Sequence, residues 1–154
     1  MSSAPGGEEE VRRLLAAYQQ YQAQADGIMQ QLSLTQVTAE GLERALAAVE
    51  ALDKAEVGQE ILVPIGSGSF VHGNLASKEK VVLNVGAGVS IEKPAAEARE
   101  ILKVRKAEVL EASRKLNEIL AKIDQEMQKI QAIMQQFEAG AGQHQQGQGS
   151  EGVV

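Results

Sequence analysis

Residues 61–70 read ILVPIGSGSF, and residues 81–90 read VVLNVGAGVS. In both stretches a short run rich in Val and Ile ends in a Gly-X-Gly turn, and a second short strand-like run follows. Short strands joined by glycine turns are typical of β-hairpins, whose tight turns need residues with positive φ. The sequence therefore predicts two hairpins. Their expected strands are residues 60–65, 70–75, 80–85 and 89–93.

Phosphate-binding loops are also glycine-rich and likewise follow a strand. A P-loop requires Gly, four residues, Gly, Lys and Ser or Thr, and then a helix whose N-terminus faces the phosphate. Neither turn has the Lys-Ser/Thr pair or the G-x-G-x-x-G spacing, and both lead into another expected strand. We therefore interpret the glycines as hairpin turns and expect no nucleotide site.

Four strands of about five residues cannot bury much apolar surface alone. The chain also has only 3% aromatic residues. We therefore expect the hairpins to complete a sheet with other chains, with Pro64 at an edge or a bulge. The expected assembly residues are Ile61, Val63, Ile65, Gly66, Gly68, Val71, Val82, Leu83, Val85, Gly86, Gly88, Val89 and Ile91.

The segments on both sides of the hairpins have the heptad pattern of coiled coils. In alternating steps of three and four from Val11 to Val49, every position is apolar or aromatic except Thr35. The second series is Ala98, Leu102, Arg105, Val109, Ala112, Leu116, Ile119, Ile123, Glu126, Ile130, Ile133 and Phe137. Two stripes of nearly equal length around one insertion predict an antiparallel helical hairpin, roughly 60 Å long at the rise of an α-helix.

The positions beside this seam change character along the helices. With Val11 and Leu102 as a positions, the e positions are polar or charged near the hairpins. Toward the free ends the apolar e positions are Leu15, Met29, Leu120, Met127 and Met134. An apolar stripe wider than two helices can bury suits binding to varied partners. Packing against a neighbouring coiled coil, or a thicker seam, is the other interpretation.

Composition excludes several function classes. The net charge of −6 argues against nucleic acid as the main partner, and no apolar run has the length of a membrane span. The absence of cysteine rules out disulfides and fits a reducing cytosol. His72 and His144 are too far apart for a metal site, and no nucleophile and base are paired. We expect no enzyme, cofactor or metal.

The expected fold is mainly α with a small β part, in which a long antiparallel two-helix coiled coil is joined by two β-hairpins. The expected organisation along the chain has a disordered N-terminus, a first helix, the hairpins, a second helix and a disordered Gln/Gly-rich tail. These segments are residues 1–7, 8–57, 58–93, 94–139 and 140–154, respectively.

Two long heptad helices around EILVPIGSGSFVHGNL (residues 60–75) and KVVLNVGAGVSIEKP (residues 80–94) closely resemble the alpha class of prefoldin subunits. The resemblance covers roughly residues 8–139. Its most specific parts are residues 60–68 and the paired glycine turns. Two hairpins, instead of one, distinguish the alpha class from the beta class.

This resemblance implies an ATP-independent cytoplasmic cochaperone. It implies a hexamer of two alpha and four beta-type subunits, in which the hairpins form a double β-barrel and the coiled coils project from it. The coiled-coil tips would hold non-native proteins and pass them to a group II chaperonin. By position, the candidate client-binding residues are Val11, Leu14, Leu15, Tyr18, Met127, Ile130, Ile133, Met134 and Phe137. The alternative is a structural coiled-coil scaffold that binds no unfolded client.

Overall fold

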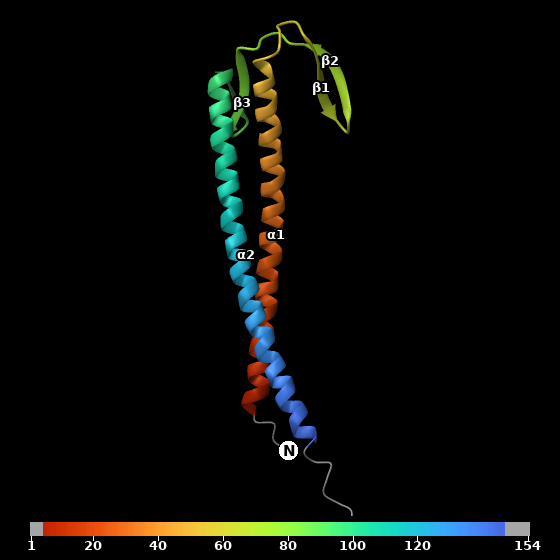
Figure 1. Cartoon of the computed structure of the whole chain (residues 1–154), viewed down its shortest axis with the longest axis vertical. Coiled ribbons are helices and arrows are strands. Elements are labelled where there is room, and N and C mark those ends of the chain that lie inside the picture. The colour runs from red at the N-terminus through yellow and green to blue at the C-terminus, as the bar shows by residue number, and fades with distance from the viewer. Residues whose placement is uncertain (1–4, 147–154) are drawn as a thin grey trace, which may run out of the picture. The chain divides into compact units, whose positions relative to one another are not determined.

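The computed structural model describes residues 5–146 of the 154-residue chain. In chain order its elements are α1 (Pro5–Leu52), β1 (Glu60–Gly66), β2 (Ser69–Asn74), β3 (Lys80–Gly86), β4 (Val89–Pro94) and α2 (Ala95–Gln146) (Figure 1). β1 pairs with β2, and β3 pairs with β4, both antiparallel and as separate two-stranded sheets. The predicted fold class is confirmed, although no barrel closes within the described part of this single chain.

The element boundaries agree with the sequence for the strands and differ for the helices. Each strand boundary lies within one residue of its expected position. α1 ends at Leu52 instead of residue 57, where three i to i−3 backbone bonds, from the amides of residues 53–55, tighten the chain out of the helix. α2 continues through Gly140, the expected stop, to Gln146. A glycine costs about 1 kcal/mol in a helix relative to alanine, and this alone does not end a helix.

The expected disordered ends fall only partly within the described chain. Residues 5–7 and 140–146 are helical. Residues 1–4 and 147–154, on which the rest of that prediction falls, lie outside the described residues.

The chain divides into two compact units, which are described separately. Of the described residues, 34–113 form the hairpin unit, and 5–33 together with 114–146 form the coil unit.

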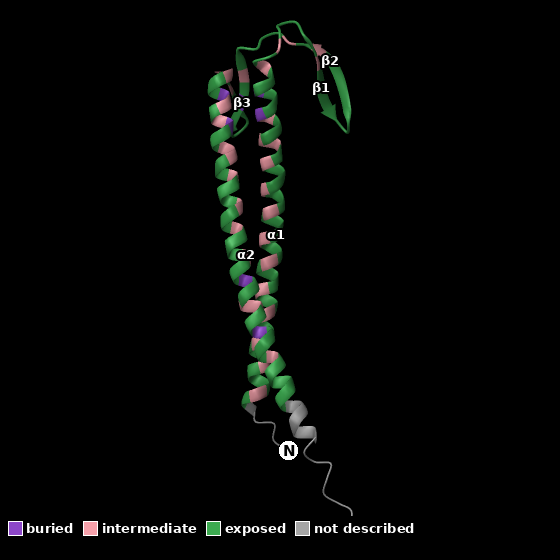
Figure 2. Ribbon diagram, viewed as in Figure 1, coloured by how far each residue is buried: buried purple, intermediate pink, exposed green. Residues whose placement is uncertain are grey.

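The hairpin unit has a small core where a strand meets both helices. The buried residues are Leu46 and Val49 of α1, Leu83 of β3, and Ala98 and Leu102 of α2 (Figure 2). Half-buried apolar residues from the same elements pack around this cluster. Leu46 and Val49 of α1 therefore pack with Ala98 and Leu102 of α2, as the predicted antiparallel helical hairpin requires.

Two ion pairs join α2 to α1 or to the residue just after it in the hairpin unit. Lys106 Nζ lies 3.6 Å from Glu43 Oε1, and the Arg99 guanidinium donates a hydrogen bond to the Asp53 carboxylate. Asp53 raises the pKa of Arg99 above its ordinary value, through this hydrogen bond first and then through its charge. Arg99 is therefore cationic at every physiological pH. The later residue of the first partner, Asp53, pairs with the earlier residue of α2, Arg99, and the earlier Glu43 pairs with the later Lys106, as in antiparallel helices.

The hairpin turns have the geometry that the glycines predict. Ser67 and Gly68 have φ of 49° and 72°, and Ala87 and Gly88 have φ of 51° and 74°. Positive φ at both central residues defines type I′ turns, whose twist matches that of the strands they join. The register shifts between Pro64 and Gly66 in one hairpin and between Asn84 and Gly86 in the other. Pro64 was expected at an edge or a bulge, and the first register shift follows directly after it.

In the coil unit the seam of α1 follows the expected series. Val11, Leu14, Tyr18 and the later seam positions of this helix are half-buried. On α2, Ile123 and Ile130 are buried (Figure 2). Gln131 Nε2 donates a hydrogen bond of 2.9 Å to Tyr18 Oη across the seam. Tyr18 therefore lies beside Gln131, which is consistent with the predicted antiparallel arrangement.

The seam of α2 differs from the expected series at some of its alternate positions, although Arg105 and Glu126 of that series are half-buried. Ser113, Leu120, Met127 and Met134 are half-buried. The residues that directly precede Ser113, Leu120 and Met134 belong to the expected series but are exposed. They are Ala112, Ile119 and Ile133, and Phe137 is exposed as well. The prediction that Leu120, Met127 and Met134 lie outside the seam is therefore wrong. One residue turns an α-helix by about 100°, so a count shifted by one residue selects a different face.

We predict that Leu102→Ala lowers the free energy of unfolding by about 2–5 kcal/mol, because it deletes buried methyl groups and leaves a cavity. Leu102 is 4% exposed. The control Leu110→Ala, on the same helix at a 52% exposed position, should stay within about 0.5 kcal/mol. Thermal and urea unfolding followed by circular dichroism measure both changes. Equal losses of unfolding free energy in the two variants would show that Leu102 does not belong to the core.

Candidate functional site

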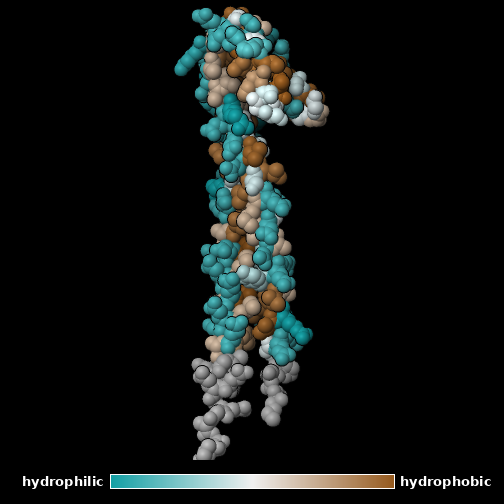
Figure 3. Space-filling view, turned by 90° about the vertical axis from the view of Figure 1, so that its right-hand side faces the viewer, coloured by the Kyte–Doolittle hydropathy of each residue, from teal (hydrophilic) through white to brown (hydrophobic). Residues whose placement is uncertain are grey.

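The β1–β2 hairpin leaves apolar side chains uncovered on both of its faces. Val63 pairs with Val71, and Pro64 pairs with Phe70 in the next row of the ladder, so the two pairs point to opposite faces. All four residues are exposed. Leu62 and Phe70, both exposed, were not among the expected assembly residues. The alternation of faces along β1 points to Leu62, and Phe70 pairs with Pro64 on the same face. Open apolar surface over the hairpins is visible in Figure 3.

The β3–β4 hairpin differs because one face is already used. Leu83 is 6% exposed in the core of the hairpin unit, and Ile91, its partner in the ladder, is half-buried. The neighbouring Val82 points to the other face and is 63% exposed. Leu83, expected to contact another chain, therefore packs within its own chain instead. Val85 and Val89, beside the turn, remain exposed.

The remaining expected assembly residues differ in their exposure. Ile61 is half-buried and Ile65 exposed, and the four turn glycines, Gly66, Gly68, Gly86 and Gly88, are exposed at the hairpin tips.

The hairpins also leave backbone hydrogen-bonding groups open. Among the described residues each strand has a single partner in its sheet, so its other edge presents unpaired N–H and C=O groups along most of its length. Such edges pair readily with strands of another chain. His72 lies on the β1–β2 surface, with its Nδ1 2.6 Å from Glu60 Oε1.

The coil unit holds the second candidate surface. Of the expected client-binding residues, Val11, Leu14, Tyr18, Met127 and Met134 are half-buried at the seam and Ile130 is buried. The exposed ones are Leu15, Ile133 and Phe137. Met29 and Ile119 are also exposed. The heptad series had placed Ile119 in the seam, so it was not among the expected client-binding residues. The apolar stripe of this unit is therefore wider than its seam, as expected, but through different residues of α2.

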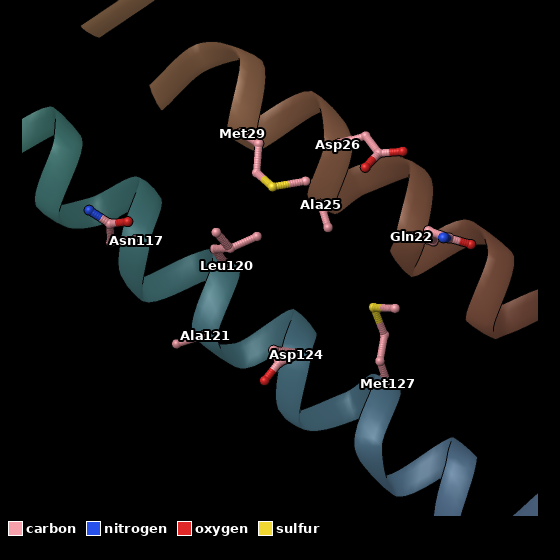
Figure 4. Close-up of a pocket in the computed structure, with 9 residues that line it drawn as sticks. All are labelled: Gln22, Ala25, Asp26, Met29, Asn117, Leu120, Ala121, Asp124 and Met127. Atoms are coloured by element: carbon pink, nitrogen blue, oxygen red, sulfur yellow. The ribbon is translucent and has the colours of Figure 1, made fainter. Parts of the chain in front are cut away.

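A groove lies between the two helices of the coil unit, with a volume of about 560 Å³. Its lining consists of Gln22, Ala25, Asp26 and Met29 of α1, and Asn117, Leu120, Ala121, Asp124 and Met127 of α2. Met29, Leu120 and Met127 extend toward the space between the helices (Figure 4). Ala25 is a seam residue with a side chain of one carbon, so the volume that a larger seam residue would fill stays open. The lining is mostly apolar, with one carboxylate on each helix.

The described residues offer no candidate metal site. They contain no group of three or more His, Cys, Asp or Glu residues that could hold a metal ion. Lys129 donates a hydrogen bond of 2.7 Å to the Glu126 carboxylate, and this hydrogen bond raises the pKa of Lys129 above its ordinary value. Neither described helix has a stretch that is both long and apolar enough to cross a membrane.

Comparisons with known proteins agree with this geometry. A family profile described as "Prefoldin subunit" matches residues 8–139. Prefoldin subunit alpha of Methanothrix thermoacetophila is 54% identical over 118 residues, covering 76% of this chain and 77% of the relative. Prefoldin subunit alpha of Pyrococcus horikoshii is 35% identical over 116 residues, covering 75% and 78%. The cryo-EM structure of filamentous PFD from Methanocaldococcus jannaschii has a TM-score of 0.65 at 26% identity, covering 76% of this chain and 97% of that chain.

Heptad helices that flank hairpins with open edges define a class of protein, the coiled-coil subunits that assemble through β-strands. The chain belongs to the prefoldin family. Its function is that of a prefoldin cochaperone subunit, and a coiled-coil scaffold without client binding is not favoured. Prefoldin subunits form oligomeric complexes.

We predict that Val82→Asp lowers the mass of the assembly without unfolding the chain. Val82 is exposed in the single chain, so the charge is tolerated there. At a contact between chains, the same charge would be buried without a partner. Native mass spectrometry measures assembly, and circular dichroism measures folding. The control Val104→Asp, at an exposed position of α2 in the same unit, should leave the mass unchanged, and a normal mass for Val82→Asp would exclude this hairpin face from assembly.

Proposed function

We propose that the chain captures non-native proteins without ATP, through the exposed apolar residues of its coil unit. The observation that carries this proposal is the group Leu15, Met29, Ile119, Ile133 and Phe137, each at least 40% exposed. The two helices already bury their seam residues against each other. The apolar side chains that stay exposed to water lower the free energy only when they cover apolar surface of another molecule. Non-native chains expose such surface.

Each contact of this kind is weak. At about 25 cal/mol per Å² of buried apolar surface, one partly exposed leucine or phenylalanine contributes on the order of 1 kcal/mol. Capture therefore depends on several subunits contacting one client, because linked weak sites raise the overall affinity. Weak single contacts also allow release to a second chaperone without a chemical step, and we propose a group II chaperonin as the recipient.

We further propose that the hairpins bind beta-type prefoldin subunits in an assembly of two alpha and four beta chains. The open strand edges and the exposed Leu62, Val63 and Phe70 support this role, because each unpaired strand edge gains hydrogen bonds and apolar cover from a neighbouring strand. The cytoplasm is the proposed compartment.

We predict that the triple variant Leu15→Ser, Ile133→Ser, Phe137→Ser suppresses the aggregation of a denatured client less than the parent chain does, with nucleotide absent and a beta-type partner present. All three side chains are at least 40% exposed, so little packing is lost. Light scattering of the diluted client measures suppression, and thermal unfolding checks that the melting temperature stays close to that of the parent.

The control for this experiment is Val104→Ser with Leu110→Ser, two exposed apolar residues of α2 in the hairpin unit. It should suppress aggregation as well as the parent chain. Equal suppression by the triple variant and the parent would remove the coil unit as the capture surface. Aggregation that proceeds unchanged with the parent chain would contradict the cochaperone proposal itself.

A further inference from the structure

The groove of the coil unit differs from the exposed stripe in its shape and its charge. It is a hollow, and its volume of about 560 Å³ exceeds that of any single side chain. Volumes of this order accommodate small ligands. Met29 and Met127 contribute flexible thioether side chains at its two sides (Figure 4), and such side chains adapt to differently shaped apolar groups.

The charge of the groove has one sign. Asp26 and Asp124 are its only ionisable lining residues. From residue 14 to residue 39 of α1, Asp26 is the only charged residue, and it forms no ion pair with any described residue. Asp124 accepts a hydrogen bond of 3.0 Å from the Gln128 amide, which leaves its charge uncompensated. The lining therefore places an acidic group on each helix beside an apolar hollow.

We propose that this groove binds segments of non-native proteins in which Leu, Ile, Met or Phe side chains are flanked by Lys or Arg. The apolar side chains enter the hollow over Ala25, Leu120 and the two methionines, and the flanking cations face Asp26 and Asp124. The inference rests on the proposed capture of non-native proteins and specifies which segments this site selects. Acidic segments are disfavoured there, because each carboxylate repels a flanking Glu or Asp.

The charge term is expected to be modest. Exposed ion pairs contribute little, so each carboxylate should change the dissociation constant by roughly twofold to fivefold. The preference should also shrink as salt screens the charges. Selection at this strength adjusts which part of a client is held, and most of the affinity still comes from apolar contact.

The test uses the full-length chain and three fluorescent, unstructured peptides that share one apolar core and carry Lys, Ser or Glu flanks. Fluorescence anisotropy at low and high salt gives the dissociation constants. The Lys-flanked peptide should bind most tightly and the Glu-flanked peptide most weakly. In Asp26→Asn with Asp124→Asn the preference should disappear, so that the three dissociation constants converge. A preference that persists in this double variant would overturn the proposal.

A second variant tests the location. Ala25→Leu fills the hollow from within the seam and should weaken binding of the Ser-flanked and Lys-flanked peptides severalfold, without lowering the melting temperature. Its matched control is Ala23→Leu, an exposed position on the same helix that is absent from the lining, and this variant should not weaken binding. Equal binding by the two variants would overturn the proposal. A smaller assembly mass for Ala25→Leu would also overturn it, by assigning the groove to a contact between copies of this chain.

The failure of this inference differs from the failure of the proposed function. If the parent chain suppresses client aggregation and binds all three peptides equally, the capture function stands and the selectivity is wrong. If the parent chain neither suppresses aggregation nor binds the Ser-flanked peptide, the capture function itself is wrong.

Discussion

The burial of Leu83 between α1 and α2 is the contact on which the hairpin unit depends. Leu83 is the one strand residue in a cluster whose other members come from the two helices, and Ala98 is fully buried, so the chain segments approach closely there. This contact commits one face of the β3–β4 hairpin to the chain itself. The other face and the strand edges remain for another chain. The burial of this side chain thus decides which face of the β3–β4 hairpin belongs to the core and which face is available for assembly.

The two hairpins have nearly the same sequence pattern but different surroundings. Both have a type I′ turn and a bulge at the same place in the repeat. Yet the β1–β2 hairpin has no buried residue, while the β3–β4 hairpin has Leu83. The repeat therefore determines the local geometry, which depends on glycine conformation and strand pairing. Which hairpin packs against the helices depends on contacts between elements.

The coil unit combines a narrow buried seam with surface that the seam does not cover. On α1 small and polar residues fill most outward positions, and Leu15 and Met29 stand out from them. On α2 the seam includes Met127 and Met134 at half-buried positions, so methionines belong to packing as well as to the groove. Substituting them would disturb the coiled coil and would not test binding alone. The groove itself depends on Ala25, because a seam residue without further carbons leaves space between the helices.

The sequence by itself determined the element order, the strand boundaries, the glycine turns and the seam of α1, because these follow from backbone conformation and regular spacing within one element. It also carried the resemblance to prefoldin. Only the tertiary structure decided which alternate positions of α2 face α1. Leu102, Val109, Leu116, Ile123 and Ile130 fit both the expected and the observed series, and the rotation of one helix about its axis is set by the side chains of the other. For the same reason the burial of Leu83 and the hollow beside Ala25 emerged only from the folded chain, since both are made by elements far apart in sequence.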